Sequence, residues 1–344
     1  SSAAVLNGDR RVMTEVSDFQ QKQSNVGPAS LDNMRATAAW QAAWGVTEFT
    51  LYYSPNDRSP KEFKAYCDFV GRMNAVLKPA RVERRVLLYY PIHDLAEEYL
   101  PMADPLRVDA QSPRAREIVG SFNRLGQFLQ RHQLPVILVD DEALQEIATR
   151  NAAKANEESP QKVLVIPAGV HLSQTAAESV DTLRSQGVRV LADGVDKDID
   201  QQLAVLGPLH PASPTITLGE FRREGRHVCI LVNVGSEPYE GGAVSETLNP
   251  ATVLHPSDGS VTSVEANAEG CYPIRLAPKE TVIIIESQAE GQQISQNNTL
   301  VDFESDAQPS IPWCAAGRTD AWSTSQIPLF SRATVCYNKK EWSP

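Results

Sequence analysis

Over the first 83 residues, hydrophobic and polar positions follow the periods of a strand, a helix, a second strand and a second helix. The strands are expected at residues 10–16 and 46–54, and the helices at residues 31–44 and 61–77. Ser30 stands where an N-cap would begin the first helix, and Gly45 stands where a C′ glycine would end it. The pattern predicts two consecutive strand–helix units.

From residue 84 the alternation continues with strands that are apolar throughout. The run RVLLYY at 85–90 is typical of a parallel strand that is buried on both faces. Further strands are expected at 134–140, 162–170 and 188–194, and helices at 114–131, around Leu144 and at 173–186. Repeated βα units with short connections predict a flavodoxin-like, three-layer α/β domain at residues 84–207.

After residue 207 the helical period disappears. Short apolar runs separated by Gly, Pro, Asn and Asp predict a small antiparallel β-sandwich at residues 208–288. Residues 289–300 are polar and predict a linker. Residues 301–344 hold three tryptophans in a segment too short to bury them, which predicts the start of a further, truncated β-domain.

Composition narrows the class of protein. A length of 344 residues predicts two or three domains, and 42% hydrophobic with 22% charged residues exclude disordered and collagen-like chains. The net charge of −11 repels phosphate backbones, so nucleic acid is not an expected partner. The apolar runs are far shorter than the roughly 20 residues of a membrane helix, so no membrane partner is expected either.

No motif for a cofactor or a metal is present in the sequence. The five cysteines show no CxxC spacing and the six histidines no HxH or HxxxH spacing, so no metal site is expected. Neither a GxGxxG nor a GxxxxGK[ST] loop occurs, so nucleotide binding is not expected and no cofactor is predicted. A disulfide between Cys314 and Cys336 is possible, and the sequence alone does not decide whether it forms.

Several pieces of the chain together resemble the C-terminal half of large barrel-type glycoside hydrolases such as β-galactosidases and α-L-rhamnosidases. The pieces are WQAAWGVTEFTLYY, YCDFVGRMNAVLKPARVERRVLLYYPIHD, LPVILVDDEAL, KVLVIPAGVHLSQTAAESVDTLRSQGVRVLADG, ILVNVGSEPYEG and PIRLAPKETVIIIES, which cover about residues 10–288. The resemblance implies that residues 1–83 are the C-terminal part of a (β/α)8 barrel and residues 84–207 a glutamine-amidotransferase-like domain. It implies that residues 208–288 are the closing β-domain.

The resemblance also implies where the protein is located, that it forms oligomers and that the chain is truncated. Proteins of this kind are expected to be extracellular or periplasmic, although no export signal is visible at the start of the chain. The amidotransferase-like domain implies a homo-oligomer. A complete (β/α)8 barrel needs about 250 residues, and only about 80 precede the second domain. The chain is therefore expected to be a fragment, truncated at the front and at the back.

Glu15 is the candidate catalytic residue. Glycosidases use two carboxylates beside the scissile bond, and in barrels such groups lie at the carboxyl ends of strands. Glu15 stands at the end of the strand at 10–16, and the resemblance places that strand seventh, where many barrel glycosidases carry a catalytic glutamate. Without the resemblance, a glutamate at a strand end is more often exposed or salt-bridged. Its partner carboxylate is expected upstream of Ser1, so the fragment alone is expected to be inactive.

The candidate substrate-binding residues follow the two predicted strands. Tyr52 and Tyr53 point to opposite faces, so one could stack on a sugar while the other packs in the core. Asp18, three residues after Glu15, could hydrogen-bond a sugar hydroxyl but is not expected to be the acid. Asn56 and Arg58, in the loop after the second strand, could contact sugar hydroxyls, although a solvated loop is the stronger expectation.

An amidotransferase-like domain raises the question of a nucleophile. The turn IPAGVHLS carries His171 and Ser173 but no cysteine, so the domain is expected to serve packing and assembly. The leading hypothesis is a glycoside hydrolase acting on oligo- or polysaccharides. The alternative is a non-catalytic scaffold for oligomerisation and carbohydrate binding, and a third, an active amidotransferase-like or peptidase-like enzyme, needs a triad that the sequence does not display.

Overall fold

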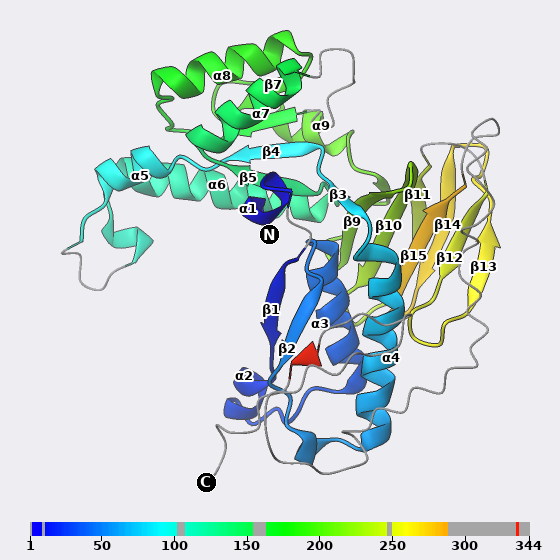
Figure 1. Cartoon of the computed structure of the whole chain (residues 1–344). Coiled ribbons are helices and arrows are strands. Elements are labelled where there is room, and N and C mark those ends of the chain that lie inside the picture. Colours follow the sequence, from blue (N-terminus) through cyan, green and yellow to red (C-terminus); the bar gives the residue numbers. More distant parts are fainter. Residues whose placement is uncertain are drawn as a thin grey trace. The chain divides into compact units, whose positions relative to one another are not determined.

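The computed structural model describes residues 2–8, 11–101, 107–153, 163–245, 250–287 and the pair 335–336. These residues form a mixed α/β structure with both parallel and antiparallel sheets, as the sequence predicts (Figure 1). The chain divides into two compact units, one made of residues 3–82 with residues 215 onward and the other of residues 83–214. The predicted linker, the possible Cys314–Cys336 disulfide and nearly all of the predicted last domain lie outside the described residues.

The first unit starts with two strand–helix pairs. Its elements up to residue 83 are α1 (Ser2–Leu6), β1 (Met13–Val16), α2 (Phe19–Gln23), α3 (Leu31–Ala43), β2 (Glu48–Leu51), the 3₁₀ turn η1 (Pro55–Asp57), α4 (Pro60–Leu77) and β3 (Arg81–Glu83). Strands β1 and β2 are parallel, with Glu15 opposite Thr50. The short strand β16 (Val335–Cys336) pairs in parallel with β2 on the other side.

Local signals define the ends of the two long helices. The Ser30 hydroxyl accepts a hydrogen bond from the Asn33 backbone N–H at 3.2 Å, and Gly45 has a positive φ of 89° just after α3. Ser59 and Glu62 form a capping box at the start of α4. The predicted start and stop of the first helix are confirmed.

The later part of the first unit consists of antiparallel strands. They are β9 (Ile216–Arg223), β10 (Arg226–Asn233), β11 (Tyr239–Val244), β12 (Ala251–Leu254), β13 (Val261–Val264), β14 (Cys271–Leu276) and β15 (Thr281–Glu286). Six strands form one sheet in the order β13-β12-β15-β10-β9-β3, and β11 pairs with β14. The pattern of apolar runs did not single out β9. Its signal is the Glu224–Gly225 loop, in which both residues have positive φ, as a two-residue hairpin requires.

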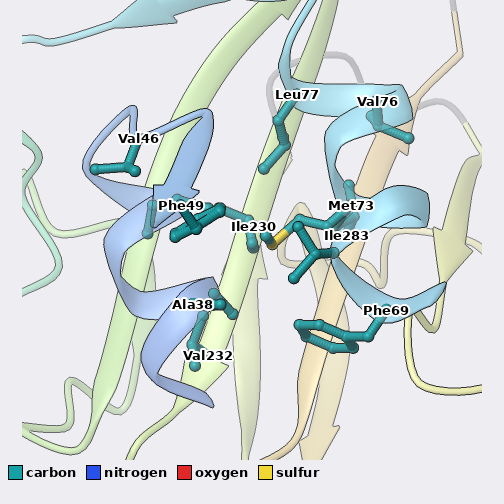
Figure 2. Close-up of a cluster of buried hydrophobic side chains, with 14 of the residues drawn as sticks. Ala38, Val46, Phe49, Phe69, Met73, Val76, Leu77, Ile230, Val232 and Ile283 are labelled. Carbon is teal, nitrogen blue, oxygen red and sulfur yellow. The ribbon is translucent and has the colours of Figure 1, made fainter. Parts of the chain in front are cut away.

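A single hydrophobic core joins the helices to both groups of strands. Phe49 of β2, Ala38 of α3, Met73 of α4 and Ile230 of β10 belong to one buried cluster, and Figure 2 shows them converging. Helix α3 contacts α4, β9 and β10. Its buried residues are small apart from one methionine: they are Met34, Ala36, Ala38, Ala39, Ala42 and Ala43. A helix buried on several sides at once needs small side chains to let its neighbours approach.

The second unit is a parallel α/β arrangement. Its elements are β4 (Val86–Tyr89), α5 (Ile92–Glu98), the 3₁₀ turn η2 (Val108–Ala110), α6 (Pro113–Arg131), β5 (Val136–Val139), α7 (Asp141–Ala153), β6 (Val163–Ile166), α8 (Gln174–Ser185), β7 (Arg189–Ala192), α9 (Ile199–Ala204) and β8 (Leu209–His210). The sheet order is β5-β4-β6-β7, with all neighbours parallel. Helix α7 is longer than the short helix expected around Leu144. None of the helices in the described ranges has the length and hydrophobicity that a membrane crossing requires.

A close approach between the backbones of β9 and α3 generates a testable prediction. A Cβ added at Gly219 of β9 would lie 2.4 Å from the Ala43 carbonyl oxygen at the end of α3, which forces the helix and the sheet apart. We expect Gly219→Ala to lower the free energy of unfolding by about 1–3 kcal/mol, the usual cost of overpacking. Denaturant unfolding followed by tryptophan fluorescence measures this. The exposed β13 variant Ser263→Ala is the control, expected to change stability by less than about 0.5 kcal/mol, and equal costs in the two variants would contradict the packing argument.

Candidate functional site

The parallel strands β1 and β2 have one face in the core and one open face. Side chains alternate along both strands, so Val16, Phe49 and Leu51 are buried. The opposite side, which we call the open face, carries Met13, Glu15, Thr50 and Tyr52, none of which is buried. Functional groups from both strands are therefore presented on one surface.

Glu15 and Tyr52 meet at the carboxyl end of this open face. The Tyr52 hydroxyl donates a hydrogen bond to Glu15 Oε1 at 3.3 Å, and Glu15 is exposed. The ring of Phe19, from α2, lies against the Tyr52 ring with their centroids 5.9 Å apart. The arrangement is an accessible carboxylate oriented by a phenol that is itself packed against an aromatic ring.

Asp18 lies in a different environment, although it is only three residues from Glu15. Its side chain is buried and its Oδ2 accepts hydrogen bonds from Arg58 Nη2 at 2.5 Å and from the Ala29 backbone N–H at 3.0 Å. Lys22, on α2, lies 3.4 Å from Oδ1. Burial acts to raise the pKa of Asp18, but the hydrogen bonds from Arg58 and Ala29 outweigh it and lower the pKa below its ordinary value of 3.8.

Arg58 and Tyr53 complete this buried group. The Arg58 side chain is 3% exposed and also donates to the Ala29 carbonyl at 2.9 Å. Its guanidinium lies 4.9 Å from the centroid of the Tyr53 ring, within the range of a cation–π contact. Tyr53 is 2% exposed, and burial raises its pKa to about 12. These side chains tie the loop after β1 to the loop after β2.

Asn56 belongs to neither group. It is exposed in η1, where its backbone N–H donates to the Ser54 hydroxyl at 3.3 Å. The next residue, Asp57, forms an ion pair with Lys22. The structure thus brings Glu15 and Tyr52 together on the open face, gathers Asp18, Tyr53 and Arg58 beneath it, and leaves Asn56 on the surface.

The side of β2 that carries Thr50 also holds a second carboxylate, Glu48. Glu48 Oε1 lies 3.1 Å from Arg11 Nε and 3.3 Å from Lys78 Nζ. Burial acts to raise the pKa of Glu48, but the hydrogen bonds from Arg11 and Lys78 outweigh it and lower the pKa below 4.5. A glutamate paired with two cations is a poor proton donor, so Glu48 does not supply the acid that a glycosidase needs.

The sequence did not reveal two of these contacts. Phe19 belongs to no recognisable sequence motif. Its ring contacts Tyr52 because α2 begins shortly after the end of β1. Lys22 could have been found from its spacing, because it stands four residues after Asp18. Within the described ranges, no group of three or more His, Cys, Asp or Glu side chains is arranged to hold a metal ion.

In the second unit, the turn after β6 has a structural role at Ser173. The Ser173 hydroxyl accepts from the Ala176 backbone N–H at 3.1 Å as the N-cap of α8, and it donates to Asp141 Oδ2 at 2.6 Å. Asp141 also accepts a hydrogen bond from the Tyr89 hydroxyl. Burial and this hydrogen bond raise the pKa of Tyr89. No cysteine occurs between residues 83 and 214 of the sequence, and Ser173 is used to cap a helix.

Comparison with solved structures finds glycoside hydrolases. A rhamnosidase from Novosphingobium sp. PP1Y is 14% identical with a TM-score of 0.49, over 87% of this chain and 33% of the rhamnosidase. An α-L-fucosidase isoenzyme 2 from Paenibacillus thiaminolyticus is 11% identical with a TM-score of 0.49, over 80% and 60%. A β-galactosidase from Bacillus circulans sp. alkalophilus is 9% identical with a TM-score of 0.41, over 66% and 45%.

The chain spans less than two thirds of the length of each of these three structures. No protein-family model matches the chain, and no curated protein sequence matches it.

The buried pair between Asp18 and Arg58 generates a testable prediction. Asp18→Asn leaves the Arg58 charge buried without its counterion, so we expect the free energy of unfolding to fall by about 3–5 kcal/mol. Asp68→Asn, which breaks the exposed pair with Lys64, is the matched control and should cost less than about 1 kcal/mol. Denaturant unfolding at pH 7 measures both. Similar costs in the two variants would show that burial does not strengthen the pair.

Proposed function

We propose that this chain is part of a glycoside hydrolase that cleaves O-glycosidic bonds in oligo- or polysaccharides, with Glu15 as its nucleophile or general base. The observation that supports the proposal best is the accessible Glu15 carboxylate at the carboxyl end of a parallel strand, held by the Tyr52 hydroxyl. Catalytic carboxylates of barrel glycosidases occupy this position in a strand. The resemblance of residues 10–288 to such enzymes supports it independently.

The proposed domain order follows the same resemblance. Residues 1–83 contribute the last strands of a (β/α)8 barrel, residues 84–207 form an amidotransferase-like domain, and residues 208–288 form the closing β-sandwich. Parallel sheets are normally covered on both faces, whereas Met13 and Glu15 on the open face of β1 and β2 are exposed among the described residues. Further barrel strands would cover this face and would bring the second carboxylate opposite Glu15.

The roles of the candidate residues follow from their burial. Glu15 either attacks the anomeric carbon or removes a proton from the attacking water, while a second carboxylate protonates the leaving oxygen. Tyr52 donates a hydrogen bond that fixes the rotamer of the Glu15 carboxylate and offers an aromatic edge to the sugar. The buried group of Asp18, Tyr53 and Arg58 holds the loops after β1 and β2 together. Asn56 is exposed on the surface in η1, where it can contact sugar hydroxyls.

The test is the activity of the longest natural protein that contains this chain on a panel of aryl glycosides that differ in sugar and anomer. We expect Glu15→Gln to lower kcat/KM by at least about a thousandfold, because an amide can neither attack nor act as a base. We expect Tyr52→Phe to lower it by about tenfold, the value of one hydrogen bond. Glu240→Gln, on an exposed β11 side chain, is the control and should leave activity unchanged.

The alternative is a non-catalytic scaffold, and a specific observation favours it for the second unit. Ser173 is committed as a helix cap, and residues 83–214 contain no cysteine, so this unit is proposed to serve assembly into a homo-oligomer. The same assay separates the two functions. Full activity in Glu15→Gln would assign catalysis elsewhere, and no activity of the natural protein on any glycoside would favour the scaffold for the whole chain.

A further inference from the structure

A buried cluster of titratable side chains lies in the six-stranded sheet of the first unit, away from the proposed site. Along β10, Val228 and Ile230 belong to the hydrophobic core, so His227 and Cys229 point to the other face of the sheet. Glu220 of β9 is directly opposite Cys229. Glu286, at the end of β15, follows Ile285, whose Cα is paired with Val228. Three adjacent strands therefore place two carboxylates, one imidazole and one thiol together.

Each ring nitrogen of His227 faces a different carboxylate. Nε2 lies 3.8 Å from Glu220 Oε1, and Nδ1 lies 3.7 Å from Glu286 Oε1. The Cys229 sulfur is 3.5 Å from Nε2. The side chains of His227, Glu220 and Glu286 are at most 3% exposed, so water cannot solvate charges here.

The protonation state of this imidazole follows from its two neighbours. A neutral imidazole carries one N–H donor, whereas an imidazolium carries two. Only the imidazolium presents a proton and a positive charge to both carboxylates. The charged form of His227 is therefore the one that matches the two carboxylates in this buried setting.

We propose that His227 is a buried imidazolium that holds β9 and β15 against β10 through its contacts with Glu220 and Glu286. The first unit then takes up a proton when it folds, and it loses stability when a rise in pH removes that proton. The cluster sits outside the proposed catalytic site, and the proposal does not depend on the proposed function.

The direction in which the pKa of His227 is shifted agrees with this proposal. Burial acts to lower this pKa, but the contacts with the Cys229 sulfur and with the carboxylates of Glu220 and Glu286 outweigh burial and raise the pKa above 6.5. A folded-state pKa above the unfolded value means that the stabilisation is complete below about pH 6.5 and decreases as the pH rises toward the folded value. The unfolding equilibrium constant should then increase by up to about tenfold per pH unit above 6.5.

The Cys229 thiol titrates above the range from pH 6.5 to 8. Burial raises the pKa of the Cys229 thiol above 9.0. Arg222, opposite His227 on β9, stays charged. Below pH 8, His227 is therefore the member of this group that determines the slope.

The test is denaturant unfolding of the full chain at several values from pH 6.5 to 8, followed by tryptophan fluorescence. All five tryptophans lie outside residues 83–214, so the signal does not report on the second unit. We expect the unfolding equilibrium constant to rise about tenfold from pH 7 to 8 in the wild type and to change less than twofold in His227→Gln. His255→Gln is the matched control, because His255 lies 3.3 Å from Glu280 but both side chains are 28% exposed, and it should keep the wild-type slope.

A second measurement keeps the proposal testable if His227→Gln does not fold. In wild-type protein labelled with ¹⁵N at histidine, one of the six imidazoles should show both ring nitrogens protonated at pH 8, and it should still be present in His255→Gln. A pH-independent unfolding constant in the wild type, a slope that persists in His227→Gln, or six neutral imidazoles at pH 8 would each overturn the proposal.

Discussion

The first unit depends on how closely α3 can approach the strands that surround it. The helix packs on β9 and β10, and the same core includes Phe49 and Leu51 of β2, so large side chains on several sides of α3 would separate the layers. Alanines on α3 and Gly219 on β9 remove that bulk. This close packing fixes β1 and β2 against the helices. The end of β1 then presents Glu15 to solvent while the neighbouring Asp18 is turned inward.

Burial decides which charged residues are structural and which are available. Asp18 has a guanidinium, an ammonium and a backbone N–H around it, which is the set of partners that a carboxylate out of water requires. Glu15 has one phenol and solvent. Glu220 and Glu286 each lie within 4 Å of the His227 imidazole. A carboxylate that is accessible and weakly held can react with a substrate, whereas one surrounded by donors stabilises the chain.

Local signals predict the longer helices but miss the short helices α1, α2, α5 and α9, and long-range contacts account for what the sequence leaves open. Ser30, Gly45 and the alternation that sends Tyr52 and Tyr53 to opposite faces all act within a few residues. The burial of Asp18 could not be predicted, because its partner Arg58 comes from the loop after the next strand. The spacing of apolar residues in α3 predicts the helix but not which side of it is buried, since a helix packed on several sides has no single apolar face. The catalytic role of Glu15 stays a prediction, as do the domain boundaries.

The connectivity of β10 has a kinetic consequence. Its two neighbours in the sheet differ in sequence distance, because β9 is joined to it by a two-residue turn whereas β15 follows only after four further strands. A hairpin closes in microseconds, and pairing with a distant strand must first overcome the entropy of a long loop. Glu220 therefore meets Cys229 early, and Glu286 arrives late. On the proposal that His227 is an imidazolium, this order couples closure of the sheet to uptake of the proton.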